Sequence, residues 1–223
     1  MITRFKGLSL LFYLKHHLFS DVEEEILENP VSGSGKFFLK NKDLVVTRPF
    51  ILKLDGVEVE PSLYTVYPLE GSVLPNFTLI GELTFSYSYS YCHVALTFPE
   101  GELRIPMITI EDDNDNFSPL ELGTSRKQVD SLIRFHIYGA NEGQRDDLAD
   151  SLVTFLDANI PVYNFNQGFP IAFGGILNRD FDFQDRITYV SCENFRIRRN
   201  PLNSGEQFEK GRCIVSCSCL FER

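Results

Sequence analysis

The stretch L-T-F-S-Y-S-Y-S-Y occupies residues 83–91 and alternates aromatic and serine side chains without a break. In an extended strand, successive side chains point to opposite faces. The aromatic residues Phe85, Tyr87, Tyr89 and Tyr91 therefore fall on one face, and the intervening serines fall on the other. Helical periodicity cannot produce this alternation. The stretch predicts a β-strand with one packed face and one wet face.

Further strands are predicted on either side of this stretch. Short apolar alternations occur at 37–39, 50–54, 57–59 and 64–67. Asp55-Gly56 separates the second from the third, and this residue pair is typical of a tight type I′ hairpin turn. The N-terminal half is therefore expected to be mostly antiparallel sheet.

The N-terminus itself has helical spacing. Leu10, Leu11, Leu14 and Leu18 form one apolar stripe, which predicts a helix over residues 8–18. Ser20 could cap a second short helix through the acidic residues 23–25. The segment 29–35 is rich in Pro, Ser and Gly and is interpreted as a linker.

The C-terminal half mixes strands with one helix. Ile133, Phe135 and Ile137 alternate as in a strand, and apolar residues between 144 and 157 recur at helical spacing. Extended segments are predicted at 160–163, 187–192 and 212–221. These elements predict an α+β fold, mainly antiparallel sheet, with a packed helix, an N-terminal helix and β-hairpin arms. The expected segments are 1–35 (helical), 36–110 (β-rich) and 111–223 (α+β).

Composition narrows the classes of function. The 223 residues carry a net charge of −10, which disfavours general binding to nucleic acid. No apolar run approaches the roughly 20 residues that cross a bilayer, so a soluble protein without a membrane partner is expected. Five cysteines in a chain of this length favour reduced thiols made in a cytoplasm.

A run of acidic and amide residues at 112–116 offers hard oxygen ligands of the kind that calcium prefers. The string matches the D-x-N-D-N element of cadherin repeats, although nothing else in the chain resembles a cadherin. An EF-hand loop is excluded by the absent glycine and distal glutamate. The favoured interpretation is a solvated acidic loop between domains. Calcium binding by Asp112, Asp113 and Asp115 is the alternative.

Cys213, Cys217 and Cys219 fall on one face of a predicted strand. A flat strand spreads them over roughly 20 Å, unlike the tight knuckles of structural zinc sites. Small cysteines that fill a sheet core are the favoured interpretation. Cys92 and Cys192 lie on other predicted strands and could approach them, which leaves free, disulfide-bonded and metal-bound thiols all open.

Catalytic machinery is not apparent. The chain has four histidines, and none lies beside a nucleophile motif. Asp146 and Asp147 lie near a helix start, where stabilisation by the helix dipole accounts for them. P-loop and dinucleotide-binding motifs are absent. We therefore expect a protein that is not an enzyme and needs no cofactor.

The segment 121–170 reads E-L-G-T-S-R, then F-H-I-Y-G-A-N-E-G-Q-R-D-D-L-A-D, then I-P-V-Y-N-F-N-Q-G-F-P. It resembles structural proteins of tailed-bacteriophage virions, in the neck and tail-completion group. With the less specific hairpins that precede it, the resemblance covers roughly residues 50–170. It implies a ring of six or twelve copies at the head-to-tail connection, with DNA passing through without sequence-specific contacts. It also implies other neck and tail proteins as partners, synthesis in the host cytoplasm and a final location in the virion.

Exposed sheet edges and hairpin arms would join neighbouring subunits by strand addition. The expected assembly contacts are apolar residues of two predicted hairpin regions: Phe50, Leu52, Leu54, Val57, Val59, Tyr87, Tyr89 and Tyr91. Pairing within the subunit's own core remains the alternative for each of them. The alternative function is a calcium-binding β-module for adhesion or carbohydrate binding on a fibre or cell surface.

Overall fold

The computed structural model describes residues 2–28, 30, 35–78, 80–96, 104–119, 127–199 and 212–222. Most of the predicted linker at 29–35 and the start of the segment at 121–126 lie outside these ranges. The fold is α+β with mostly antiparallel strands, as predicted.

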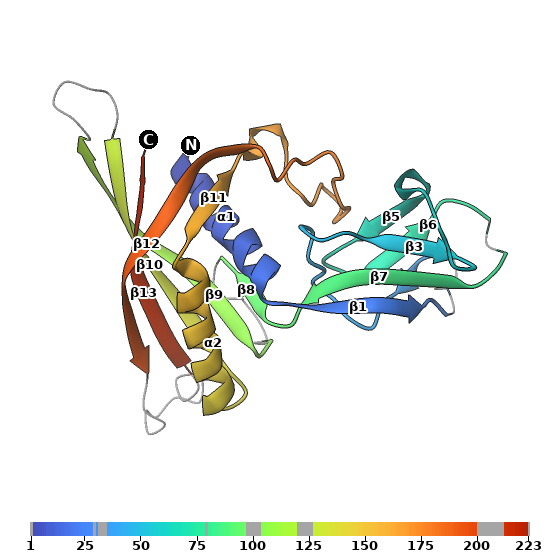
Figure 1. The fold of residues 1–223 in the computed structure, drawn as a ribbon, viewed down its shortest axis with the longest axis horizontal. Coiled ribbons are helices and arrows are strands. Elements are labelled where there is room, and N and C mark those ends of the chain that lie inside the picture. The colour runs from blue at the N-terminus through green and yellow to red at the C-terminus, as the bar shows by residue number, and fades with distance from the viewer. Residues whose placement is uncertain are drawn as a thin grey trace. The chain divides into compact units, whose positions relative to one another are not determined.

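Two compact units make up the chain (Figure 1). Unit 1 comprises Met1–His17, Cys92–Asn164 and Phe183–Arg223, and unit 2 comprises Leu18–Tyr91 and Phe165–Asp182. These units draw on different stretches from the expected segments 1–35, 36–110 and 111–223. The N-terminal helix belongs with the C-terminal half, and residues 165–182 return to the N-terminal half.

Unit 1 is built on a six-stranded sheet with the order β11-β12-β13-β10-β9-β8. All neighbouring pairs are antiparallel except β8 with β9. The strands are β8 (His93–Ala95), β9 (Met107–Pro119), β10 (Lys127–Tyr138), β11 (Asn159–Tyr163), β12 (Arg186–Arg199) and β13 (Arg212–Glu222). Pro161 lies on the edge strand β11, where a missing N–H is tolerated.

Two helices, α1 (Ile2–His17) and α2 (Glu142–Leu156), pack on this sheet and touch each other (Figure 1). The Tyr13 hydroxyl donates to the Phe155 carbonyl at 2.9 Å. At the start of α2, Asn141 accepts from the Gln144 backbone N–H, and the Gln144 side chain accepts from the Ala140 N–H, which together form a reciprocal cap. The predicted apolar stripe of this helix is confirmed by its buried leucines.

Unit 2 contains two smaller sheets, with the orders β1-β7-β3-β4 and β2-β6-β5. Their strands are β1 (Phe19–Ile26), β2 (Phe37–Phe38), β3 (Ile51–Leu54), β4 (Val57–Glu58), β5 (Tyr64–Tyr67), β6 (Ser72–Pro75) and β7 (Leu83–Ser90). Two short 3-10 helices, η1 (Pro61–Leu63) and η2 (Phe165–Gln167), complete it. Phe85 lies fully buried at the centre of the core, where it stacks on Phe50 and Tyr87.

The predicted hairpin turn is present. Asp55 and Gly56 have φ values of 50° and 78° between β3 and β4, as a type I′ turn requires. The Asp55 carboxylate also accepts the Glu82 backbone N–H at 2.9 Å. Strand β7 is present, but the expected wet face is wrong: Thr84, Ser88 and Ser90 are buried and Ser86 is partly buried. Ser88 is buried because its hydroxyl lies against Asp21 at 2.6 Å, and Ser90 is buried with its hydroxyl on the Leu18 carbonyl.

Two predictions of local structure are wrong. The residues expected to form a second helix after Ser20 form strand β1, because β7 offers a partner strand and Glu25 finds tertiary partners. The Glu25 carboxylate is buried and accepts hydrogen bonds from the Tyr87 hydroxyl and the Lys40 N–H. The acidic run at 112–116, expected to be an interdomain loop, lies within strand β9 and pairs with β10.

Candidate functional site

The expected assembly contacts divide by burial. Phe50, Leu52 and Tyr87 belong to the unit 2 core, so the expectation that they contact neighbouring subunits is corrected. A buried core side chain cannot reach a neighbour without opening the sheet. Val57 is 70% exposed and Tyr91 is 43% exposed, whereas Leu54, Val59 and Tyr89 are partly buried against the core. The surface part of the predicted set therefore lies mainly at the β3–β4 hairpin.

An open cavity of about 360 Å³ lies beside this hairpin, entirely within unit 2. Its apolar lining comes from Leu54, Val57, Val59, Leu63 and Phe77. Glu58 and Glu60 line it as well, and both are exposed. Three of the predicted contact residues thus form one wall of a cavity that the sequence alone did not reveal.

Unit 2 also presents an apolar protrusion. Ile171 and Leu177 form an antiparallel bridge that closes a short turn, and Phe173 at its tip is fully exposed. Gly174 and Gly175 have φ values of 86° and 79°, which glycine adopts without strain. The Leu177 backbone N–H donates to the Val66 carbonyl at 2.9 Å and anchors the turn to β5. We call residues 171–177 the Phe173 turn.

Sequence reasoning missed the Phe173 turn, although a signal was present. The string A-F-G-G-I places a large aromatic residue directly before two glycines. Turn residues are usually polar or small, so a phenylalanine at a tip is unusual.

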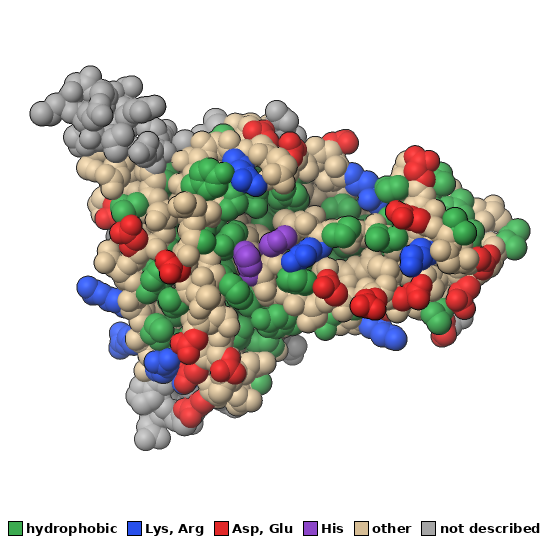
Figure 2. All heavy atoms as spheres, viewed as in Figure 1, with side chains coloured by type: hydrophobic (Ala, Val, Ile, Leu, Met, Phe, Trp, Pro, Cys, Tyr) green, Lys and Arg blue, Asp and Glu red, His purple; other side chains and the backbone are tan. Residues whose placement is uncertain are grey.

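The edge strand β1 of unit 2 carries acidic side chains. Figure 2 shows them in a row over β1, whose Asp21, Glu23 and Glu24 are exposed. Charges on an edge strand discourage pairing with a foreign strand.

The predicted calcium ligands are brought together around a lysine. The Lys6 ammonium, fully buried on α1, lies 3.0 Å from Asp112 and 2.8 Å from Asp115. Asp115 also accepts a hydrogen bond from the Ser131 hydroxyl, and Asp113 pairs with Arg134 at 2.6 Å. Burial raises the pKa of Asp115, but the hydrogen bonds from Lys6 and Ser131 outweigh it and lower the pKa overall. The position between Asp112 and Asp115 is therefore taken by a protein cation.

His136 is held on the same sheet by two partners. Its Nε2 lies 2.8 Å from Glu111, and its Nδ1 lies 2.8 Å from the Arg212 guanidinium. Because arginine can only donate, Nδ1 accepts and Nε2 carries the proton. Burial is the main cause that lowers the pKa of His136, and the nearby Arg212 adds to it. With both ring nitrogens engaged, the imidazole is in a structural arrangement rather than poised for proton transfer.

The carboxylate pair at the start of α2 is also accounted for by its neighbours. Asp146 lies 2.9 Å from Arg145 and 3.2 Å from Arg199, and hydrogen bonds from these arginines lower its pKa. Asp147 is exposed on the same turn.

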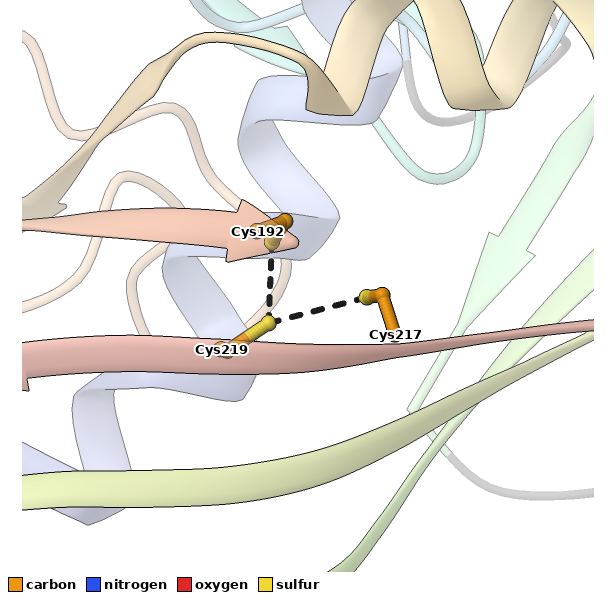
Figure 3. A group of neighbouring side chains, drawn as sticks. All are labelled: Cys192, Cys217 and Cys219. Carbon is orange, nitrogen blue, oxygen red and sulfur yellow. Dashed lines mark hydrogen bonds between the residues drawn. The ribbon is translucent and has the colours of Figure 1, made fainter. Parts of the chain in front are cut away.

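The five cysteines are all buried and free of disulfides. Cys213, Cys217 and Cys219 lie on one face of β13, as predicted. Cys192 on the neighbouring strand β12 joins the last two, and the three sulfur atoms lie within 4.8 Å of one another (Figure 3). Cys213 is not part of this group.

No family model and no curated sequence matches the chain. Neither helix among the described residues has the length and apolar character needed to cross a membrane.

Proposed function

We propose that this protein is a structural subunit whose copies join head to tail, with the Phe173 turn of one copy inserted into the apolar cavity of the next. The observation that carries the proposal is a fully exposed phenylalanine on the same unit as an open apolar cavity. Insertion of an exposed aromatic ring into an apolar cavity is favourable because it removes apolar surface from water.

Size supports the fit. A phenylalanine buries about 150–250 Å² on insertion, and full burial stabilises by about 1.5–3 kcal/mol. The cavity volume of about 360 Å³ accommodates a side chain of this size. A stable interface needs roughly 1,200 Å² in total, so neighbouring residues must contribute. The exposed Val57 and Leu63 at the cavity and Ile176 beside Phe173 extend both surfaces.

Different surfaces on the two partners make this contact heterologous. Heterologous contacts between identical subunits either close into rings or continue as filaments. A ring of six or twelve copies accords with the phage resemblance of segment 121–170. Within unit 1, that segment contributes strand β10, helix α2 and strand β11, the order that the resemblance implies.

We further place the ring at the head-to-tail connection of a tailed-bacteriophage virion, in contact with other neck and tail proteins. The net charge of −10 suits a channel wall past which DNA slides without sequence-specific binding. The neutralised carboxylates and the fully engaged His136 support a role without catalysis.

Native mass spectrometry and negative-stain electron microscopy of the full chain test this function. We expect rings of six or twelve copies, and dissociation to monomers in the variant Phe173→Ser. Phe38→Ser removes another exposed phenylalanine of unit 2 and is expected to leave the rings intact. A chain that stays monomeric at every concentration, even with virion neck and tail proteins present, would overturn the proposal.

A further inference from the structure

Three cysteine side chains converge inside unit 1 (Figure 3). The Cys192 and Cys219 sulfur atoms lie 2.8 Å apart, and those of Cys217 and Cys219 lie 3.7 Å apart. Each of the three side chains is at most 5% exposed. Within the described residues, the group has these three members.

Strand geometry explains the convergence. Cys217 and Cys219 are two residues apart on β13, so their side chains share one face of the sheet. Cys192 is the direct partner of Cys219 in the antiparallel pairing of β12 with β13. Side chains of directly opposite residues have Cβ atoms about 4.5–5.5 Å apart. Three sulfur atoms thus meet on a flat sheet without the tight knuckle that zinc sites usually use.

Ordinary packing does not account for the 2.8 Å between the Cys192 and Cys219 sulfur atoms. Carbon atoms in a packed core approach to about 3.5–4.0 Å, and sulfur is larger than carbon. A disulfide has a bond length of about 2.05 Å and joins two sulfur atoms, not three. The 3.7 Å separation is an ordinary sulfur–sulfur contact, whereas the 2.8 Å separation is shorter than a contact and longer than a disulfide bond.

We infer that Cys192, Cys217 and Cys219 bind one thiophilic metal ion, Zn²⁺ or Cu⁺, through three thiolates. A zinc–sulfur bond of about 2.3 Å places tetrahedral ligands about 3.8 Å apart. The Cys217–Cys219 separation already matches this value, and Cys192 needs to move by about 1 Å. Thiolate ligands select Cu⁺ and Zn²⁺ over hard cations. Cu⁺ is satisfied by three sulfurs, whereas Zn²⁺ takes one small exogenous ligand in addition.

The ion would act as a staple between two strands. Cys192 and Cys219 are 27 residues apart in the chain, so the metal closes a loop that includes the β12–β13 connection. Each thiol loses its proton to solvent on binding, so affinity falls as the pH falls. A metal bound only by the folded chain stabilises it in proportion to its affinity.

Elemental analysis and metal titration test the inference on the full chain. Protein purified without chelator is expected to contain one Zn²⁺ or one Cu⁺ per chain. Metal-free, reduced chain is then titrated separately with Zn²⁺ and with Cu⁺, and the tighter binder identifies the ion. Binding is expected to raise the melting temperature, and a chelator to reverse the rise.

Matched variants assign the ligands. Cys217→Ala is expected to abolish stoichiometric binding, while Cys213→Ala and Cys92→Ala keep it. Cys213 is the stronger control, because it is buried on the same face of the same strand. Titration of the unmodified chain with Co²⁺ requires no variant, because thiolate ligands give an intense sulfur-to-cobalt absorption band.

Three results would overturn the inference. The first is reduced chain that binds none of these ions at a one-to-one ratio. The second is binding lost as fully in Cys213→Ala as in Cys217→Ala. The third is a Cys192–Cys219 disulfide in freshly isolated protein.

Discussion

Unit 1 and unit 2 differ in how deeply their most unusual side chains are buried. In unit 1, the unusual side chains are buried: Lys6 is fully buried beside two carboxylates, and three buried cysteines meet across strands β12 and β13. In unit 2, the core is apolar apart from the buried Glu25 carboxylate, while Phe173 is fully exposed and an apolar cavity is open to solvent. The cysteines and Lys6 of unit 1 are thus shielded from solvent, whereas Phe173 and the apolar cavity of unit 2 are accessible to another molecule.

This contrast distinguishes side chains that stabilise their own subunit from side chains that can stabilise an assembly of subunits. A buried, partnered ion holds its own subunit together and gives a substrate little access. An exposed aromatic side chain adds little to the free energy of unfolding of its own subunit, so under the proposed function Phe173 acts by binding another copy. We therefore expect mutations in unit 1 to change stability and mutations at the Phe173 turn to change assembly.

The largest expected effect compares two phenylalanines of unit 2. Phe85→Ala removes a fully buried ring that stacks on two others, and should lower the free energy of unfolding by about 3–5 kcal/mol. Phe173→Ala should change it by less than about 0.5 kcal/mol, because the ring has no packing to lose. Urea unfolding of the dissociated chain measures both. A large loss of stability in Phe173→Ala would break the comparison.

The next effect tests the enclosed charge. Lys6→Met leaves Asp112 and Asp115 without their cation and should destabilise by on the order of 2–4 kcal/mol, less than a fully buried pair because both carboxylates reach solvent. The control Lys53→Met removes a surface pair at 3.8 Å from Glu24 and should change stability by under about 0.5 kcal/mol. Equal effects in the two variants would show that burial of Lys6 is unimportant.

The same pair gives a pH dependence. The pKa of Asp115 is lowered in the folded chain, so its contribution is complete above the ordinary value of 3.8 and disappears as the pH falls through the lowered value. The stability difference between the parent chain and Lys6→Met should therefore be largest near neutral pH and shrink as the pH falls below 3.8, which urea unfolding at several pH values measures.

A smaller effect concerns the hairpin that carries the cavity. Gly56 has a φ of 78°, and a Cβ added there meets no atom within 4 Å. Gly56→Ala should therefore destabilise by about 1 kcal/mol through backbone strain alone. Val57 directly follows Gly56 and lines the cavity, so a strained turn also displaces this wall. The free energy of association, measured by light scattering, should therefore fall by more than the free energy of unfolding. Unchanged assembly would place the contact away from the β3–β4 hairpin.

The smallest effect is the titration of His136. Its folded pKa lies below the ordinary 6.5, so the stability tied to the neutral ring is present above that pH and is lost as the pH falls below it. Glu111, Arg212 and Arg134 face the ring, and His136→Gln can keep the hydrogen bonds to the first two. The variant should lose less stability between pH 7 and pH 5 than the parent chain. A steeper loss would contradict the neutral tautomer.

Local signals predicted local features. Asp55-Gly56 marked a hairpin, and the leucine spacing of α2 marked a helix, because each depends on neighbours along the chain. Residues 112–116 were misassigned, since β9 is stabilised by Lys6, 106 residues away from Asp112, and by pairing with β10. The glutamates of β1 were misassigned for a similar reason: Tyr87 on β7 provides a partner for Glu25.

The candidate sites show the same division. Val57 and Val59 were predicted as assembly contacts from the hairpin pattern, whereas the cavity beside them needs Leu63 and Phe77 from later in the chain. The cysteine group depends on the register of β12 with β13, which no spacing within one strand reveals. Features that depend on contact between distant segments therefore could not be predicted from the sequence.

The most direct test of the central claim mixes two variants that each lack one side of the contact. Phe173→Ser keeps the cavity, and Val57→Asp, at a 70% exposed position, keeps the Phe173 turn. Native mass spectrometry should find each variant monomeric alone and a one-to-one heterodimer on mixing, because only one intact contact can form. Rings in either variant alone, or no heterodimer in the mixture, would contradict assembly through Phe173 and the cavity.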